Sequence, residues 1–427
     1  MKRQQTLVSH SKDLLGVGRL TIDAISGVTN IAEGLHHAIL NLGGTLDSAD
    51  SATDSIPGAN TKPTPRTRGI TGLVYRSIRG INGLVGLGLE ALIRHLTESI
   101  GEQDRSPGHG AVVSALNGVL GDHLNDKRNP LAITMSLRSN GKKLAVEDTA
   151  EFLTKAGGRV AIFIHGLCMN DLQWLRRGHD HGEALARDLG ITPIYLRYNS
   201  GLHVSQNGRQ LADLLQTLSS HSPSGAELYI IAHSMGGLVS RSAYYYGEQG
   251  GHTWPAQLRK LICLGTPHHG ALLERGGNWI DVILDSNPFS APFARLAKIR
   301  SSGITDLRYG NIIDEDWNNR DRFAMAGDQR CLQSIPEKVP CYAIAAATIG
   351  DAVNFSDDVL GDGLVTVASA LGRHEKPNAD MGFAAENCWL ARGINHMDLL
   401  NDPQVYQTLL MYMKRDEFIE SAVSDEV

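Results

Sequence analysis

Short apolar runs alternate with amphipathic segments along residues 106–427 of this 427-residue chain. Nearly continuous apolar runs are typical of strands buried on both faces, whereas apolar residues spaced three and four apart are typical of helices. The predicted strands lie within residues 159–166, 192–199, 227–234, 258–270 and 340–348. The predicted helices cover residues 111–124, 171–190, 205–220, 236–247 and 403–415. This alternation predicts an α/β domain with a mostly parallel sheet and helices on both faces.

Residues 131–147 contain two β-like runs joined by Ser139-Asn140-Gly141-Lys142. Asn-Gly is the preferred pair for a two-residue hairpin turn, because both positions need positive φ angles. We therefore expect an antiparallel hairpin at the start of the domain, which a mixed sheet accommodates.

The first 105 residues follow a different pattern. Residues 19–39 and 72–92 resemble each other, and both show the apolar spacing of amphipathic, Gly-rich helices. Residues 43–68 between them are rich in Gly, Ser, Thr, Asp and Pro, which is typical of a linker. We expect a helical N-terminal extension over residues 1–105. It either covers part of the main domain, or contacts a lipid surface or a second copy of the chain.

A long insert over residues 271–330 interrupts the alternation of strands and helices. It exceeds an ordinary connection between elements, and it carries apolar patches, Trp, Phe and turn residues. These features predict an inserted cap or lid over an active site, with a helical excursion on the surface as the alternative.

The composition is that of a globular protein, with 42% hydrophobic and 20% charged residues. A net charge of -6 gives no electrostatic argument for nucleic-acid binding. The five Cys show no metal-type spacing and are interpreted as reduced thiols, with a small loop closed by Cys331 and Cys341 left open. The N-terminus has no apolar core typical of a secretory signal. We therefore expect a cytoplasmic protein, with peripheral membrane contact left open.

The segment "LYIIAHSMGGLVSRSAYYYG" (228–247) places Ser234 between a predicted strand and a predicted helix. A nucleophile at the tip of a sheet needs a sharp turn flanked by small residues, which is the logic of G-x-S-x-G. Ala232 takes the first position here and Gly236 the last. Ser234 is thus the candidate nucleophile, and the alternative is a Ser that caps the helix.

A serine nucleophile needs a base that accepts its proton and a carboxylate that orients the base. Five histidines follow Ser234, namely His252, His268, His269, His374 and His396. His396 lies in a loop before the final predicted helix, where the base belongs in the chain order nucleophile, acid, base. His396 is therefore the candidate base.

Four aspartates compete for the role of the acid, namely Asp351, Asp357, Asp358 and Asp362. Asp362 is favoured because Gly361 and Gly363 on either side permit a tight approach. Asp351, which follows the strand ending near residue 348 most closely, is the named alternative.

Charge that develops on the carbonyl oxygen requires preorganised N–H donors. We assign this oxyanion hole to the backbone N–H groups of Met235 and Leu167, the latter in the loop "FIHGLCMND" (163–171). The candidate substrate-binding residues are His165, His268 and Tyr198. For Tyr198, a role in the strand-to-helix connection is the competing interpretation.

No metal or other cofactor is expected. His179 and His181 are two residues apart on a segment predicted to be helical, which would point their side chains in different directions. This spacing favours two surface histidines over a metal site.

The motifs "HGL", "AHSMGG", "GTPHHG", "DGLVTVASALG" and "NHMD" occur here in the order seen in bacterial triacylglycerol lipases and GPI inositol-deacylase-like esterases. The chain resembles these lipase-like α/β-hydrolases over about residues 131–415. The resemblance implies an α/β-hydrolase fold, with Ser234 as nucleophile, Asp362 as acid and His396 as base. In secreted lipases the position of Asp398 helps to bind a structural calcium ion. The partner aspartate and the disulfide of those enzymes have no counterpart in this sequence.

The sequence therefore predicts a serine carboxylic-ester hydrolase (an esterase or lipase) that acts on a hydrophobic acyl ester, small molecule or lipid, through an acyl-enzyme. An acyltransferase or amidase with the same residues, and an inactive hydrolase-fold binding protein, are the alternatives. The oligomeric state is not predicted.

Overall fold

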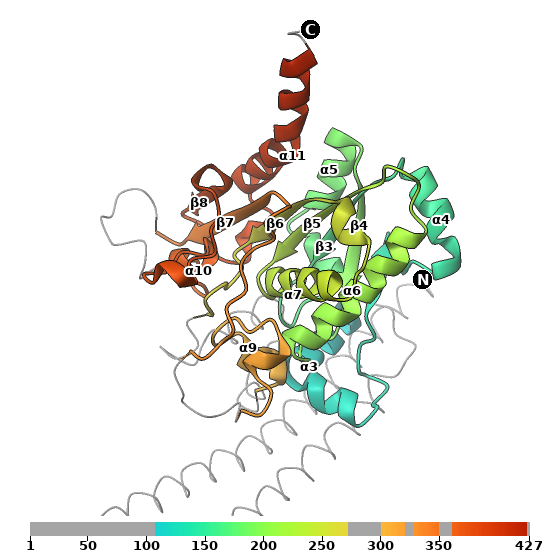
Figure 1. Ribbon diagram of the computed structural model, residues 1–427. Helices are drawn as coiled ribbons and strands as arrows, with labels where there is room; N and C mark the ends of the chain where they lie inside the picture. Colours follow the sequence, from blue (N-terminus) through green and yellow to red (C-terminus); the bar gives the residue numbers. More distant parts are fainter. Residues whose placement is uncertain (1–106, 272–299, 321–327, 350–360, 425–427) are drawn as a thin grey trace, which may run out of the picture. The chain divides into compact units, whose positions relative to one another are not determined.

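The computed structural model describes residues 107–271, 300–320, 328–349 and 361–424 (Figure 1). These residues belong to one compact unit, Arg105–Val427. The predicted N-terminal helices, the predicted linker, most of the insert and the competing acid Asp351 lie outside the described residues. None of the helices in the described part of the chain combines the length and apolar character needed to cross a lipid bilayer.

An eight-stranded sheet forms the centre of this unit, in the order β2-β1-β4-β3-β5-β6-β7-β8. The strands β3 to β8 run parallel, and only β1 and β2 are antiparallel to their neighbours. Their bounds are β1 Ser136–Ser139, β2 Lys142–Lys143, β3 Arg159–Ile164, β4 Thr192–Arg197, β5 Glu227–His233, β6 Leu258–Leu264, β7 Cys341–Ala347 and β8 Cys388–Arg392. The predicted mostly parallel sheet is confirmed.

Helices cover both faces of the sheet (Figure 1). On one face, α5 and α11 pack on a core that contains Phe163, Ile231 and Ile344, and α6 and α7 lie on the other. The helices are α3 Pro107–Asp126, α4 Val146–Lys155, α5 His181–Leu189, α6 Val204–Ser220, α7 Met235–Gln249, α9 Ser302–Asp306, α10 Val367–Ala370 and α11 Pro403–Ser424. The 3-10 turns are η1 Asp171–Trp174, η2 Trp254–Gln257, η4 Asp314–Asp316, η5 Pro377–Ala379, η6 Ala385–Asn387 and η7 Asp398–Leu400.

The predicted hairpin forms, but its second strand is shorter than expected. Asn140 and Gly141 have φ angles of 51° and 69°, as a two-residue turn with positive φ at both positions requires. The second strand contains only two residues, and the chain enters α4 at Val146. The strand predicted over residues 144–147 is therefore wrong. Its few apolar residues fit the start of an amphipathic helix equally well.

The helix predicted over residues 171–190 is wrong in its first half. The chain forms the short turn η1, and α5 begins only at His181. Asp180 sets this start, because its carboxylate accepts the N–H groups of Gly182 and Glu183 at 2.7 and 3.2 Å. The predicted end is confirmed: Gly190 caps the helix with a φ angle of 66°.

The described part of the insert is fixed to α6. The carboxylate of Asp306 accepts the N–H of Val204 at 2.8 Å and lies 3.0 Å from His203 Nδ1. The Trp317 ring stacks on His203 with 3.7 Å between centroids, and its indole N–H donates to Ser205 Oγ. These contacts hold residues 300–320 on the main domain. The cap or lid role of the whole insert stays a prediction.

Candidate active site

Ser234 occupies a strained turn between β5 and α7. Its φ and ψ angles are 55° and −127°, a region that costs a non-Gly residue about 1–3 kcal/mol. The turn is tight because small residues follow the serine: a β-carbon on Gly236 would overlap the carbonyl oxygen of Ile164 at the end of β3. Ser234 is 6% exposed. The local geometry is that of a nucleophile held at a strand-to-helix elbow.

His396 and Asp362 are brought together at the end of the sheet. The distance from His396 Nδ1 to Asp362 Oδ2 is 2.6 Å, and both residues are only 2% exposed. The other carboxylate oxygen of Asp362 accepts the N–H groups of Leu364 and Val365 at 2.9 Å each. An ionised carboxylate only accepts hydrogen bonds, so His396 donates from Nδ1 and keeps Nε2 free to accept a proton.

His233 connects this pair to the Ser234 turn. It immediately precedes Ser234, and its Nε2 donates to the carbonyl oxygen of His396 at 3.1 Å. The two imidazole rings lie 4.6 Å apart between centroids. Burial lowers the pKa of His233 well below its ordinary value, so it is neutral at pH 7. This contact was not predicted, because spacing along the chain does not show that a loop 163 residues later returns to β5.

The loop after β3 lies directly against Ser234. A β-carbon on Gly166 would lie 2.9 Å from Ser234 Cβ and 3.4 Å from Ser234 Oγ, so only Gly fits there without displacement. The next peptide N–H belongs to Leu167. Within the described residues, neither this N–H nor that of Met235 donates a hydrogen bond. The predicted oxyanion donors therefore flank the serine from two different elements.

His165 and Tyr198 lie beneath this loop, at 0% and 1% exposure. Their rings stack with 4.4 Å between centroids, and the Tyr198 hydroxyl donates to the His165 carbonyl oxygen at 2.8 Å. His165 Nδ1 donates to the carbonyl oxygen of Gly166 at 2.8 Å, and burial lowers the pKa of His165 to about 4. Both side chains thus support the loop from inside. Their predicted contact with substrate stays a prediction.

His268 is also completely buried, in a polar network at the end of β6. Arg241 on α7 donates to its Nδ1 at 3.3 Å and to the carbonyl oxygen of Gln333. Arg330 donates to the backbone carbonyl of His268 at 2.9 Å. Burial lowers the pKa of Arg241 to about 10, so its guanidinium stays charged at pH 7. In this position His268 joins α7 to the segment before β7, and its predicted contact with substrate also stays a prediction.

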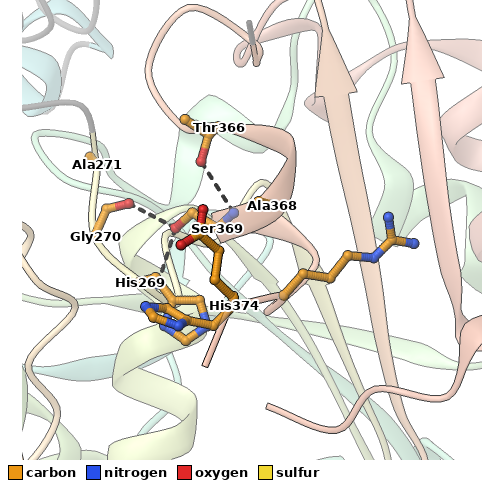
Figure 2. Close-up of a pocket in the computed structure, with 9 residues that line it drawn as sticks. His269, Gly270, Ala271, Thr366, Ala368, Ser369 and His374 are labelled. Atoms are coloured by element: carbon orange, nitrogen blue, oxygen red, sulfur yellow. Dashed lines mark hydrogen bonds between the residues drawn. The ribbon is translucent and has the colours of Figure 1, made fainter. Parts of the chain in front are cut away.

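A cavity of about 490 Å³ opens beside α10, between the end of the β6 loop and the segment after Asp362 (Figure 2). Ser369 organises its floor by accepting the N–H of His269 at 3.0 Å and donating to the carbonyl oxygen of Gly270 at 2.7 Å. Its lining residues are His269, Gly270, Ala271, Thr366, Ala368, Ser369, Arg373, His374 and Glu375. The predicted triad is not among them. The cavity nevertheless lies close in sequence to two predicted site residues. His269 directly follows His268, and Thr366 lies four residues after Asp362.

His179 and His181 correct another expectation. Their side chains do not diverge: His179 Nε2 lies 2.8 Å from His181 Nδ1, and His181 Nε2 donates to the carbonyl oxygen of Leu399 at 2.9 Å. The reason is that Asp180 between them is extended, with a φ angle of −136°, which places residues two apart on the same side. The pair anchors the loop that carries His396.

The described residues were also compared with the sequence predictions for metal ligands and for a disulfide. The described residues contain no group of three or more His, Cys, Asp or Glu side chains arranged for a metal ion. Asp398, which corresponds to a calcium ligand of secreted lipases, pairs with Arg177 at 3.2 Å. All five cysteines are free, so Cys331 and Cys341 do not close a loop.

Part of the chain matches a protein family, and several solved structures are similar to it at low sequence identity. The family described as "PGAP1-like alpha/beta domain" matches residues 155–339. No curated protein sequence matches the chain. The mature lipase BlEst2 of Bacillus licheniformis is a similar solved structure, with 19% identity over 60% of this chain and 90% of that chain and a TM-score of 0.40. Aspergillus fumigatus lipase B is 14% identical over 59% and 51% of the two chains, with a TM-score of 0.38. The metagenomic carboxyl esterase MGS0156 is 13% identical over 61% and 76%, with a TM-score of 0.34.

Three independent features therefore coincide in one chain. The sheet is parallel from β3 to β8, the strained Ser234 turn joins β5 to α7, and the matched family domain includes β3 to β6 and this turn. Residues 155–339 are thus similar to the PGAP1-like alpha/beta domain, and the described part of the chain has the mostly parallel sheet that the sequence predicted.

Proposed function

We propose that this protein is a serine hydrolase of carboxylic esters that works through an acyl-enzyme. The observation that carries the proposal is the buried 2.6 Å hydrogen bond between His396 Nδ1 and Asp362 Oδ2, next to the strained Ser234 turn. A buried His–Asp pair beside a strained serine is the arrangement that nucleophilic catalysis on a carbonyl requires.

In the acylation step, Ser234 Oγ attacks the ester carbonyl carbon while its proton passes to His396 Nε2. Asp362 stabilises the resulting imidazolium through Nδ1. The N–H groups of Leu167 and Met235 donate to the developing oxyanion, and each such donor is worth about 100- to 1,000-fold in rate. The tetrahedral intermediate then collapses, and the imidazolium gives its proton to the departing alcohol.

In the deacylation step, a water molecule replaces the alcohol. His396 takes a proton from this water as it attacks the acyl carbonyl, and the same oxyanion donors stabilise the second intermediate. Ser234 recovers its proton as the acid leaves. In both steps, the proton transfers and the stabilisation of the oxyanion are assigned to side chains and amides of this chain.

The proposed substrate class is an ester with a hydrophobic acyl group. Support comes from the insert over residues 271–330, whose apolar patches follow directly on the β6 loop at the site. In its described part, Ile304 and Leu307 are buried against the domain. A graded panel of p-nitrophenyl esters from acetate to palmitate tests this class. We expect kcat/KM to rise with chain length beyond acetate, and a profile that falls steadily from acetate would reject a hydrophobic acyl group.

A fluorophosphonate probe tests the proposed nucleophile, because it phosphonylates only activated serines. We expect the wild-type protein to be labelled at Ser234 and to hydrolyse esters, and Ser234→Ala to do neither. Esterase activity that survives in Ser234→Ala would overturn the assignment. A folded wild-type protein that neither labels nor hydrolyses any ester of the panel would favour an inactive binding protein. An acyltransferase would be recognised by transfer of the acyl group to an added alcohol faster than to water.

A further inference from the structure

The helix α3 precedes the part of the chain that matches the family domain, yet it touches the predicted oxyanion loop backbone to backbone. A β-carbon on Gly118 would overlap Cys168 Sγ and lie 2.9 Å from both Cα and the amide nitrogen of Cys168. Glycine is therefore the only residue type that fits at position 118 when the helix and the loop have the observed separation. Cys168 immediately follows Leu167, whose N–H is the predicted oxyanion donor.

Cys168 has a backbone conformation that needs external support. Its φ angle is 60°, in the left-handed region that non-Gly residues seldom occupy. Such conformations persist only where the surroundings over-determine them. Two contacts hold the backbone of Cys168 in this conformation. Gly118 packs against Cys168, and the N–H of Cys168 donates to Ser200 Oγ at 3.0 Å.

The same face of α3 also holds the loop that carries Ser200. Asn199 donates from Nδ2 to the carbonyl oxygen of Gly121 at 2.9 Å, and its Oδ1 accepts the N–H of Gly201 at 3.1 Å. A β-carbon on Gly121 would overlap Asn199 Oδ1. The helix thus contacts both the oxyanion loop and the loop that anchors it.

The helix itself is anchored in the domain. Asn117, which is completely buried, donates from Nδ2 to the carbonyl oxygen of Leu131 at 2.7 Å and accepts the N–H of Ile133 at 2.9 Å. On the side of the insert, Ser301 Oγ donates to the carbonyl oxygen of Gly118 at 2.6 Å. Because α3 is anchored in the domain and contacts both loops, its position determines where the backbone of these loops lies.

We propose that α3 is a positioning element for the reaction: through Gly118 and Ser200 it holds the Leu167–Cys168 segment so that the Leu167 N–H points at the oxyanion. This inference rests on the proposed ester hydrolysis. It assigns a role in the chemistry to a helix outside the matched family domain.

The test compares two Gly-to-Ala substitutions on one helix. Gly118→Ala forces the oxyanion loop to move, whereas a β-carbon on Gly110 would lie 3.6 Å from its nearest neighbour, Asn170 Nδ2, which is an ordinary contact. An oxyanion donor acts only in the transition state, so its displacement lowers kcat and leaves KM nearly unchanged. We expect Gly118→Ala to lower kcat by about 10-fold or more with KM within about 2-fold, because small misplacements of reacting groups cost up to about 100-fold. Gly110→Ala should retain wild-type kcat and KM.

A double-mutant cycle with Cys168→Ala identifies the contact responsible. Removing Sγ takes away the main overlap, so the loss of kcat caused by Gly118→Ala should be smaller in the Cys168→Ala background. Ser200→Ala provides a second approach that leaves the helix untouched. It removes the acceptor of the Cys168 N–H and should also lower kcat with little change in KM, which decides the question if Gly118→Ala does not fold.

The outcomes separate this inference from the proposed function. If wild type is labelled at Ser234 and hydrolyses esters, but folded Gly118→Ala and Ser200→Ala retain kcat within about 2-fold, the role of α3 is rejected and the ester hydrolase stands. The role of α3 is also rejected if Gly118→Ala and Gly110→Ala lose the same kcat. It is likewise rejected if Gly118→Ala loses the same kcat in the wild-type and Cys168→Ala backgrounds. A folded wild-type protein without labelling or hydrolysis would overturn both.

Discussion

His233 Nε2 donates a hydrogen bond to the backbone carbonyl of His396 at 3.1 Å, and the two rings lie 4.6 Å apart. The residue before the candidate nucleophile thus holds the loop of the candidate base. The contact fixes the main chain of His396, while Asp362 fixes its ring. Two separate anchors therefore determine where His396 Nε2 lies relative to Ser234.

Replacement of His233 tests the first anchor. We expect His233→Leu to lower kcat about 10-fold, because the loop loses its hydrogen bond and the base shifts. His233→Gln keeps a donor and should lose less. The free energy of unfolding should change little in His233→Leu, because the buried Nδ1 of His233 has no hydrogen-bond partner among the described residues and its removal offsets part of the loss. Steady-state kinetics and urea unfolding check these expectations, and an unchanged kcat in His233→Leu would reject the role.

Asp362→Asn tests the second anchor against the competing acid. The amide would turn an N–H toward His396 Nδ1 and force the proton onto Nε2, so the base could not accept the serine proton. We expect kcat to fall about 1,000-fold or more. Asp351→Asn is the matched control and should retain nearly full kcat. The opposite ranking of the two variants in an ester assay would assign the acid to Asp351.

The stability of the domain should fall in mild acid. Burial lowers the pKa of His165 and of His181 from 6.5 to about 4. Between these values the unfolded chain binds protons that the folded state does not, so the free energy of unfolding decreases as pH falls from about 6.5 to 4. Each histidine contributes about 1.4 kcal/mol per pH unit across this window. Above pH 6.5 each histidine is neutral in both states, so the free energy of unfolding does not depend on its protonation. Below pH 4 each histidine is protonated in both states, and the loss of stability that it causes no longer grows.

Urea unfolding at pH 7.5, 6.0 and 5.0 measures this slope. His181→Asn should be less stable than wild type at pH 7.5 and should show a shallower slope. His221→Gln, at an exposed position, is the control and should keep the wild-type slope. A slope in His181→Asn as steep as in wild type would show that His181 does not titrate in this manner.

Thiol reactivity should single out Cys331, the exposed cysteine of the five. Cys168, Cys263 and Cys341 are buried, and burial raises the pKa of each thiol, to about 11 for Cys263. We expect one thiol of the native protein to react rapidly with an aromatic disulfide reagent at pH 8. Cys331→Ser should abolish this phase. Three or more rapidly reacting thiols in the native protein would contradict the burial.

Much of the fold could be predicted because its central strands are buried on both faces. β3, β5 and β7 are nearly continuous apolar runs, and such runs between helical segments specify a parallel sheet. The candidate site followed from the same feature, because the carboxyl ends of parallel strands meet at one edge. Ser234 and Leu167 were predicted because each follows the end of a predicted strand, and Asp362 because glycines flank it.

Elements at the edge of the domain were harder to predict. β8 was missed because its residues are mostly half-buried, which leaves no continuous apolar run. The start of α5 did have a signal in the sequence, namely Asp180 followed three residues later by Glu183, but the apolar spacing from residue 171 masked it. The pairing of His179 with His181 depended on that boundary. Contacts such as Gly118 with Cys168 arise only when distant segments fold together, and no local pattern reports them.

Trapping of the acyl-enzyme shows whether Ser234 carries the acyl group during ester hydrolysis. The protein is mixed with a p-nitrophenyl ester, quenched in acid within milliseconds and analysed by intact mass and peptide mapping. We expect one added acyl group per wild-type chain on Ser234, and none on Ser234→Ala. An acyl group on any other residue, or ester hydrolysis that continues in Ser234→Ala, would contradict it.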